Sequence, residues 1–449
     1  MNLIEDPIPK LIKDIAVPAS VGFFFNTMYN VVDIYYVGML STEMVAALSL
    51  TFPMFFIILA FGIGIGQGAT ALIANAMGEN NQNRVMILAI QSFSFTILMA
   101  LIISIIGIML APTLLGILGA TDTYLDYALS YINIVYLGSV FLLVQFTINA
   151  SLNAKGDTKT FRNVLIVSFV LNLGLDPWLM FGGLGIPAMG IKGVAVATVI
   201  IQALGSVYLY RSFKKASICQ SIFCRHLIPD FRIFKEIFAQ AFPASVNTMT
   251  VAAGVFIITF FISKFGQAGV AAFGIATRIE QMVLIPTIGL NIAVLTLTGQ
   301  NNGAGKLDRV RAAWKKSLWY GFLMMLIGTI LVLVFSRQLI VLFTADDMVI
   351  GPAIQYLRIS ALIFFAYVIL FTTVALLQGL KKPMYAIWVG VFRQIAAPIP
   401  VFWLLSVLLQ WELLGIWWGI FFIAWSSALF TLWYGKRILD QVSRDPAHR

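Results

Sequence analysis

The chain matches itself when it is shifted by 225 residues. Four short identities mark the repeat: Pro18-Ala19-Ser20 with Pro243-Ala244-Ser245, Val45-Ala46-Ala47 with Val270-Ala271-Ala272, Arg84-Val85 with Arg309-Val310, and Gly190-Ile191 with Gly415-Ile416. Because the repeated segments are apolar, the pattern predicts two copies of one six-helix unit in a membrane. Internal duplication of this kind is typical of transporters, whose binding site lies at the interface of the halves.

Composition assigns the chain to an all-α, polytopic membrane class. Hydrophobic residues make up 60% of the sequence and charged residues 11%, whereas soluble domains carry about 25% charged residues. A helical span needs roughly 20 apolar residues, and the first apolar run is full length and follows Glu5-Asp6, so no cleavable signal peptide is expected. Twelve such runs are predicted, at 15–37, 48–74, 85–111, 127–150, 161–182, 190–212, 238–263, 272–298, 316–336, 352–378, 384–409 and 414–435.

The basic residues predict the orientation of the chain in the membrane. With both termini inside, 23 of the 29 Lys and Arg residues fall in the tails and inner loops. The outer loops hold Lys192, Lys264 and Arg337. This asymmetry follows the positive-inside rule, so we expect a multi-pass protein of the plasma (inner) membrane with cytoplasmic termini. The net charge of +10 therefore indicates topology, and no nucleic-acid partner is expected.

The predicted domains are an amino-terminal bundle at 1–212, a cytoplasmic linker at 213–237 and a carboxyl-terminal bundle at 238–449. The linker is basic and partly amphipathic, which suits a segment on an anionic leaflet; a solvated linker is the other interpretation. Each repeat has an even number of spans, so both enter the membrane in the same direction and are related by a pseudo-two-fold axis along the membrane normal.

No enzyme or metal chemistry is predicted. Cys219 and Cys224 fall in the inner loop, where thiols stay reduced, and with His226 alone nearby they do not form a zinc site. The sequence lacks the G-x-x-x-x-G-K-[ST] pattern that cradles phosphates. An ion gradient is then the expected source of energy, with no cofactor besides the coupling ion.

Three acids lie inside predicted spans: Asp33, Asp176 and Glu280. An ionisable group at mid-membrane costs on the order of 2.5 to 3.5 kcal/mol, which makes it a functional candidate. Asp33 belongs to a predicted polar stripe with Asn26, Asn30 and Tyr29 on the first span. A buried acid held by an arginine is the structural alternative.

Asp176 lies between Asn172 and Pro177 on the fifth span. Pro177 cannot donate to the carbonyl of Leu173, so we expect a kink there and a carbonyl free for a water, an ion or a side chain. Since neither Asp33 nor Asp176 has an in-span Lys or Arg in its own repeat, taking up a proton or a cation would lower the cost of burying them.

The second repeat lacks this site, because its equivalent positions are Ile258, Ala397 and Val401. It has its own group of charges instead. Glu280 is expected to point away from Arg278 on the same helix. Its pairing with Arg358 or Arg393 would make a salt bridge, and a second coupling site is the other interpretation.

With these residues in view, the chain resembles the multidrug and toxic compound extrusion (MATE) family over essentially its whole length. The resemblance rests on the first span from Pro18 to YNVVDIYYVG, the GENNQNRV turn at 78–85, its partner GQNNGAGKLDRV at 299–310, the NAKGDTK loop at 153–159, and LNLGLDP at 171–177.

The resemblance implies two bundles around a V-shaped cleft, from which cationic or amphipathic drugs leave in exchange for protons or sodium. It further implies that Asp33 and Asp176 form the cation site, and that Pro18 bends the first span when the acids change charge. The implied hydrogen-bond network around the acids comprises Asn172, Asn149, Tyr131, Tyr29 and Thr198.

The seventh and tenth spans contain no Asp or Glu, unlike branches of the family with acids there. This favours the branch that relies on the amino-terminal acids, with the proton as first choice of coupling ion and sodium as second. A monomer is expected because the cleft would lie within one chain. Flexible and aromatic side chains suit promiscuous binding, so the predicted cleft wall includes Met249, Met282, Phe273, Trp388 and Phe392.

Three other classes have weaker support in the sequence. A flippase for lipid-linked oligosaccharide, of the same superfamily, would need cations from both halves to hold pyrophosphate, whereas Arg278, Arg358 and Arg393 lie in one half. A receptor or structural protein would leave the buried acids without a purpose. A major-facilitator transporter would carry a basic-acidic signature in the inner loop that here reads GENNQNR.

Overall fold

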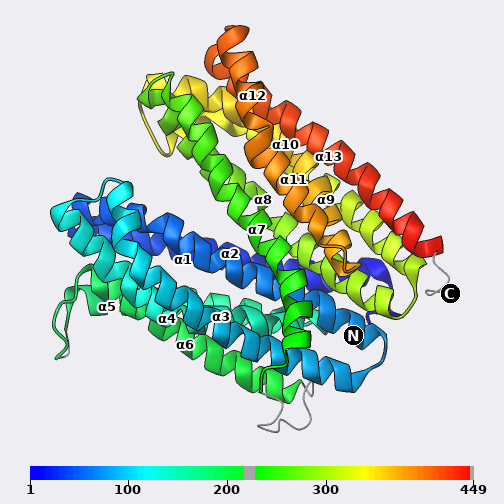
Figure 1. The fold of residues 1–449 in the computed structure, drawn as a ribbon. Helices are drawn as coiled ribbons and strands as arrows, with labels where there is room; N and C mark the ends of the chain where they lie inside the picture. The colour runs from blue at the N-terminus through cyan, green and yellow to red at the C-terminus, as the bar shows by residue number, and fades with distance from the viewer. Residues whose placement is uncertain (184, 217–227, 445–449) are drawn as a thin grey trace. The chain divides into compact units, whose positions relative to one another are not determined.

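The computed structural model describes residues 1–183, 185–216 and 228–444, and its architecture is helical (Figure 1). Twelve helical segments of the described chain are long and apolar enough to cross a membrane, which confirms the predicted count. Eleven spans are single helices: α1 Ile8–Leu40, α2 Thr42–Gly78, α3 Gln82–Ile117, α4 Asp122–Ala154, α5 Lys159–Phe181, α6 Ile191–Lys215, α7 Phe231–Ser263, α8 Gln267–Gly303, α9 Leu307–Val341, α10 Asp347–Gly379 and α13 Glu412–Arg444.

The helices extend beyond the predicted apolar runs because polar turns at their ends are also helical. Side chains cap several of these ends: Ser41 accepts a hydrogen bond from the Met44 amide before α2, and Asn81 accepts one from the Arg84 amide before α3. Such caps satisfy amides that have no partner inside the helix.

The eleventh span, Met384–Leu408, is irregular. It comprises α11 Met384–Val391, a π-helical turn at Phe392–Ala396, α12 Pro398–Phe402 and a second π-helical turn at Trp403–Leu408. Pro398 and Pro400 have no N–H to donate to the preceding turn. The amide of Ala397 instead donates to the carbonyl of Phe392 at 2.9 Å. The span was predicted at 384–409, and the two prolines account for its irregular form.

The chain forms two compact units. One comprises Val21–Ser245, and the other comprises Met1–Ser20 together with Val246–Arg449. The division therefore falls inside α1 and α7, at Ser20 and Ser245, and not in the connection at 213–237. These two serines are equivalent in the repeat, so the duplication of the sequence is visible in the division of the structure. Cys219, Cys224 and His226 lie outside the described residues.

We call α1 and α7 the crossing helices, because each passes from one unit to the other. Each of them begins in a unit that is built mainly from the other repeat. In the unit that contains the carboxyl terminus, the start of α1 packs on α8 through Leu11, Ile12, Ile15, Leu290, Ala293 and Leu297. In the Val21–Ser245 unit, the start of α7 packs on α2 through Phe234, Ile237, Ala241, Ile65, Ala69 and Leu72.

Glycines allow these helices to approach each other closely. A Cβ on Gly64 of α2 would lie 2.6 Å from the amide nitrogen of Ser245 and 2.8 Å from the carbonyl oxygen of Ala241. A Cβ on Gly289 of α8 would lie 3.0 Å from the carbonyl carbon of Ala16. Gly64 and Gly289 are also equivalent in the repeat, so the same close contact is made once in each unit.

Two equivalent arginines hold the segments that lead into the crossing helices. Arg309 donates to the carbonyl oxygens of Asp6 at 2.7 Å and Leu3 at 3.3 Å. Arg84 pairs with Glu236 on α7, with N–O distances of 2.8 and 3.0 Å. The Arg-Val matches of the sequence repeat thus mark corresponding attachments at the amino-terminal ends of α1 and α7.

Candidate cation-coupling site

The Val21–Ser245 unit brings two acids together from different helices. Asp33 lies on α1 and is 8% exposed, while Asp176 lies on α5 and is fully buried. Asn172, one turn before Asp176, donates from Nδ2 to Oδ1 of Asp33 at 2.8 Å. The two carboxyl groups lie near enough for their charges to act on each other. The predicted pairing of these acids is therefore present in the fold.

Three oxygen atoms at this site are buried without a donor. Both carboxylate oxygens of Asp176 and the Oδ1 atom of Asn172 accept no hydrogen bond from any described residue. A buried, unpaired polar atom is costly, and two facing carboxylates repel each other unless a proton or cation lies between them. The described part of the chain holds no group of three or more His, Cys, Asp or Glu that could bind a metal ion.

Two tyrosines and a threonine complete the wall of the site. The Tyr29 hydroxyl on α1 donates to Oγ1 of Thr198 on α6 at 3.1 Å. Tyr131 on α4 is 7% exposed and lies near enough to both acids to interact with their charges. Helices α1, α4, α5 and α6 thus each contribute a side chain, as the resemblance implied for Tyr29, Tyr131 and Thr198.

The carbonyl that Pro177 leaves free has a partner that the sequence did not indicate. The Tyr36 hydroxyl on α1 donates to the carbonyl oxygen of Leu173 at 3.1 Å. Tyr36 lies one turn after Asp33, and Leu173 lies next to Asn172. This bond therefore links α1 to α5 beside the acids. Of the three partners predicted for the free carbonyl, a water, an ion or a side chain, the structure shows a side chain.

The loop after α5 holds the end of the helix that carries Asp176. The amides of Met189 and Gly190 donate to the carbonyls of Leu179 and Met180, both at 3.1 Å. Gly190 has a φ of 56°, a backbone conformation that favours glycine. A helix end satisfied in this way keeps Asp176 at a fixed position against α1.

Asn149, predicted for the network, does not belong to it. Asn149 and Tyr131 are 18 residues apart on α4, which at about 1.5 Å per residue is roughly 27 Å. Its Oδ1 atom is buried without a partner among the described residues. The stripe on α1 also divides, because Asn26 and Asn30 are exposed and the Asn30 side chain bonds the Asn26 carbonyl at 2.8 Å.

The helix-bending residues Pro18 and Pro177 both lie within continuous helices. α1 runs through Pro18 from Ile8 to Leu40, and α5 runs through Pro177 to Phe181. Pro18 is buried two residues before the point at which α1 passes from one unit to the other. A change of bend at Pro18 is therefore still a prediction.

Glu280 lies in a second buried cluster, in the unit that contains the carboxyl terminus. The Tyr356 hydroxyl donates to Oε2 of Glu280 at 2.8 Å, and Tyr367 and Ser360 lie near the same carboxylate. Arg393, on the π-helical turn of the eleventh span, attracts the Glu280 carboxylate and lies 5.6 Å from the centroid of the Tyr367 ring.

The other two in-span arginines do not join this cluster. Arg278 is exposed whereas Glu280 is buried, as expected for residues two apart on a helix. Arg358 donates to Oγ of Ser336 at 3.3 Å. The described salt bridges are Arg84–Glu236 and Arg311–Asp440, so the predicted salt bridge of Glu280 with Arg358 or Arg393 is not among them. Arg393 only attracts the Glu280 carboxylate from nearby.

The predicted cleft-wall residues separate into exposed and buried side chains. Phe273 belongs to the core, because it is 6% exposed and its ring lies against Tyr356 and Trp417. Its prediction as a cleft residue was wrong, since an aromatic residue at helical spacing packs inward as readily as outward. Met282, Trp388 and Phe392 are 40%, 69% and 49% exposed, and Met249 is half-buried.

The Tyr36–Leu173 bond gives a first testable prediction. Tyr36→Phe is expected to lower the free energy of unfolding by about 0.5–1.5 kcal/mol, the net value of a typical hydrogen bond. Thermal unfolding of the detergent-purified protein measures the change. Tyr35→Phe is the matched control, because Tyr35 is 61% exposed. Equal unfolding temperatures for the two variants would contradict the role given to Tyr36.

Twelve apolar spans, a duplicated six-helix unit and facing buried acids define a membrane transporter. The MatE family profile matches residues 18–178 and again 243–404. The chain belongs to the MatE family of transporters, and the repeat seen in the sequence is the two copies of this domain. It is accordingly a transport protein and not an enzyme.

Curated relatives match over most of their length. The chain is 28% identical to the probable multidrug resistance protein YoeA of Bacillus subtilis, over 85% of this chain and 83% of that protein. It is 26% identical to the FAD transporter of Shewanella oneidensis, over 89% and 88% of the two chains. It is also 26% identical to the probable multidrug resistance protein NorM of Thermotoga maritima, over 93% and 90%.

Solved structures share the fold. A solved structure of the outward-facing conformation of a multidrug resistance MATE family transporter matches with a TM-score of 0.92 at 23% identity, over 99% of this chain and 98% of that one. A MOP superfamily transporter from Pyrococcus furiosus matches with a TM-score of 0.91 at 23% identity, over 99% and 98%. The twelve-helix fold of this chain is thus the fold of MATE transporters.

Proposed function

We propose that this transporter exports cationic or amphipathic drugs and toxins in exchange for protons, as a secondary antiporter in the plasma membrane with cytoplasmic termini. The observation that carries the proposal is the facing pair of Asp33 and Asp176, both buried and with no Lys or Arg bonded to either among the described residues. The multidrug relatives in Bacillus subtilis and Thermotoga maritima support the class of cargo.

The proposed exchange uses the pair as a single binding site for a cation. When both acids are ionised, the site carries negative charge in the membrane. Entry of one proton from outside neutralises one of the two acids, allows its carboxyl group to donate to the remaining carboxylate, and removes their mutual repulsion. Release of the proton inside restores the charged state. Coupling requires that drug binding and proton binding favour different states of the same protein.

Sodium is the alternative coupling ion. The three unpaired oxygens of Asp176 and Asn172, together with the Asp33 carboxylate, are hard oxygen ligands of the kind that bind such cations. The proton is preferred because only protonation supplies the donor that facing carboxyl groups lack. The choice between these ions is independent of the choice of cargo.

The test is ethidium efflux from proteoliposomes under an imposed pH gradient and, in separate vesicles, an imposed sodium gradient. Efflux driven by the pH gradient is the expected result. Efflux driven by sodium alone would keep the site and change the ion. Failure under both gradients would contradict drug antiport and would move a flippase for lipid-linked oligosaccharide to first place.

The cargo is tested in the same vesicles by competition. One relative is named for FAD transport, and FAD carries the anionic pyrophosphate group that an acidic site repels. We expect excess FAD to leave pH-driven ethidium efflux unchanged and an excess of a second organic cation to slow it. Competition by FAD in place of the cation would overturn the cationic class of cargo.

A further inference from the structure

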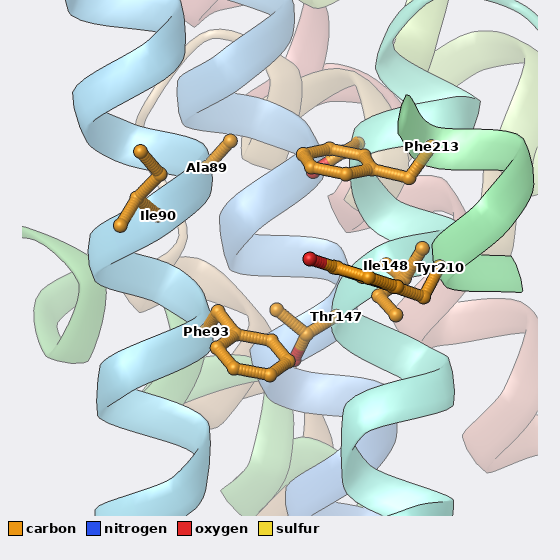
Figure 2. A pocket seen from close by; sticks show the side chains of 8 residues that line it. Ala89, Ile90, Phe93, Thr147, Ile148, Tyr210 and Phe213 are labelled. Atoms are coloured by element: carbon orange, nitrogen blue, oxygen red, sulfur yellow. The ribbon is translucent and has the colours of Figure 1, made fainter. Parts of the chain in front are cut away.

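A cavity of about 190 Å³ lies between α3, α4 and α6 of the Val21–Ser245 unit. Figure 2 shows side chains from α3 on one side of the cavity and side chains from α4 and α6 on the other. Its lining comprises Ala89, Ile90, Phe93, Thr147, Ile148, Ser151, Tyr210 and Phe213. The cavity is larger than the roughly 150 Å³ apolar cavities that hold benzene.

The lining presents hydrocarbon and aromatic surface. The lining has three hydroxyl groups, on Thr147, Ser151 and Tyr210. The Oγ1 atom of Thr147 is already bonded to Thr96 at 2.6 Å and to the Leu143 carbonyl at 3.2 Å. Tyr210 is 40% exposed. Val207 and Tyr208, on the preceding turn of α6, are 50% and 47% exposed. An apolar crevice that opens on an exposed apolar helix face suits an acyl chain.

Positive charge lies at the mouth of this cavity. Lys214 places its Nζ atom 4.8 Å from the centroid of the Tyr210 ring, which is itself part of the wall. Lys155 donates to the carbonyl oxygen of Ala216, just after α6, and Arg211 and Lys215 are exposed on the last turns of the same helix. No salt bridge joins these cations to an acid within the described ranges.

The depth of the cavity matches the position of an acyl chain below a headgroup. Tyr210 and Phe213 precede the end of α6 at Lys215 by five and two residues, which is about 3–8 Å along the helix. Thr147 and Ser151 precede the end of α4 at Ala154 by seven and three residues, about 5–11 Å. The lining therefore lies just inside the membrane surface that carries the basic residues.

We propose that this crevice is a binding site for an anionic phospholipid, with one acyl chain between α3, α4 and α6 and the phosphate among Lys155, Arg211 and Lys214. Charge complementarity selects the anionic headgroup, since each Lys or Arg near an anionic surface adds about fivefold in binding. The bound lipid would contact α3, α4 and α6 at once and would stabilise their packing.

The crevice is separate from the proposed coupling site. Tyr131 and Thr147 are 16 residues apart on α4, which is about 24 Å. A lipid site here is thus independent of the cargo and of the ion that the transporter uses.

The test is photo-crosslinking in proteoliposomes of phosphatidylcholine that contain a small fraction of phosphatidylglycerol with a diazirine on one acyl chain. Peptide mapping is expected to find adducts on Ala89–Phe93 and Thr147–Ser151 at several times the yield found on α9 residues Leu326–Leu331, an exposed apolar face that reports general contact with lipid. The same diazirine carried on phosphatidylcholine is expected to lose this preference.

The headgroup contact is tested with Lys214→Gln, which is expected to reduce the crevice adducts about fivefold. Lys316→Gln is the matched control, because Lys316 is equally an exposed lysine of the described chain and lies in the other unit. Even labelling of the crevice and Leu326–Leu331 would overturn the site. Equal labelling by both lipids, or an equal effect of both lysine variants, would overturn its anionic specificity.

Discussion

Asp176→Asn and Asp33→Asn are each expected to abolish gradient-driven ethidium efflux, or to reduce it by a factor between about 5 and 150, the usual range of coupling between two sites. Asparagine keeps the size of aspartate but neither releases a proton nor carries a charge. Asp176 is fully buried and Asp33 is 8% exposed, and the described residues hold no group of three or more His, Cys, Asp or Glu in which another acid could replace them. Efflux from proteoliposomes under the imposed pH gradient measures the loss.

The asparagine variants should fold as well as the parent protein. A charge in the membrane costs on the order of 2.5 to 3.5 kcal/mol, and its removal should leave the unfolding temperature unchanged or raise it. Loss of transport without loss of stability would then report coupling. If the Asp33→Asn and Asp176→Asn variants still transported ethidium against a gradient, the proposed site would be wrong for protons and for sodium alike.

Glu280→Gln is the matched control, because Glu280 is also a buried acid, 7% exposed, but lies in the other unit. It accepts a hydrogen bond from Tyr356 and is attracted by Arg393, so it has a donor and a nearby cation of its own. We expect this variant to retain most of the pH-driven efflux. A loss as large as that of Asp176→Asn would make the Glu280 cluster a second coupling site.

The acids could be predicted from the sequence because burial in a membrane is visible in hydropathy and charge is visible in residue type. Asp33 and Asp176 stand out in apolar runs without compensating cations. The free carbonyl of Leu173 could likewise be predicted from Pro177, because proline has no N–H to donate to it. Tyr36, which bonds that carbonyl, was not predicted, because the contact depends on how α1 crosses α5.

Helix geometry alone could have excluded one predicted residue. Asn149 was placed beside Tyr131 through the family resemblance, although 18 residues of helix separate the two by roughly 27 Å. Phe273 was predicted at the cleft for its residue type, whereas the fold packs it against Tyr356 and Trp417. Periodicity gives the faces of a helix, but only tertiary contacts decide which face is covered.

The spans and the duplication could be predicted, but the division into units could not. Composition and loop charge suggested a boundary in the basic connection at 213–237. The structure divides at Ser20 and Ser245, within the repeated Pro-Ala-Ser motif that the sequence comparison had found. The sequence shows that this motif is repeated, but not that α1 and α7 each begin among helices of the other repeat.

These shared contacts make two equivalent glycines, Gly64 and Gly289, sensitive to substitution. Gly64 faces the backbone of Ser245 at 2.6 Å and Ala241 at 2.8 Å, measured from a Cβ built on the glycine, and Gly289 faces the backbone and side chain of Ala16 and Ser20 in the same way. Backbone atoms cannot rotate aside as a flexible side chain does. An added methyl group must therefore separate the helices.

Gly64→Ala and Gly289→Ala are each expected to destabilise the protein by about 1–3 kcal/mol, the usual cost of overpacking, although alanine is the better helix former. Gly66→Ala is the matched control on α2, because its Cβ would meet its nearest neighbour at an ordinary 3.5 Å, and Gly274→Ala is the control on α8, where no atom lies within 4 Å. Thermal unfolding in detergent compares each pair.

Since the controls share the change in helix propensity, a difference in stability within a pair isolates the effect of the close contact. If each control were as unstable as its partner, the close approach of α2 to α7 and of α8 to α1 would not be what the glycines provide.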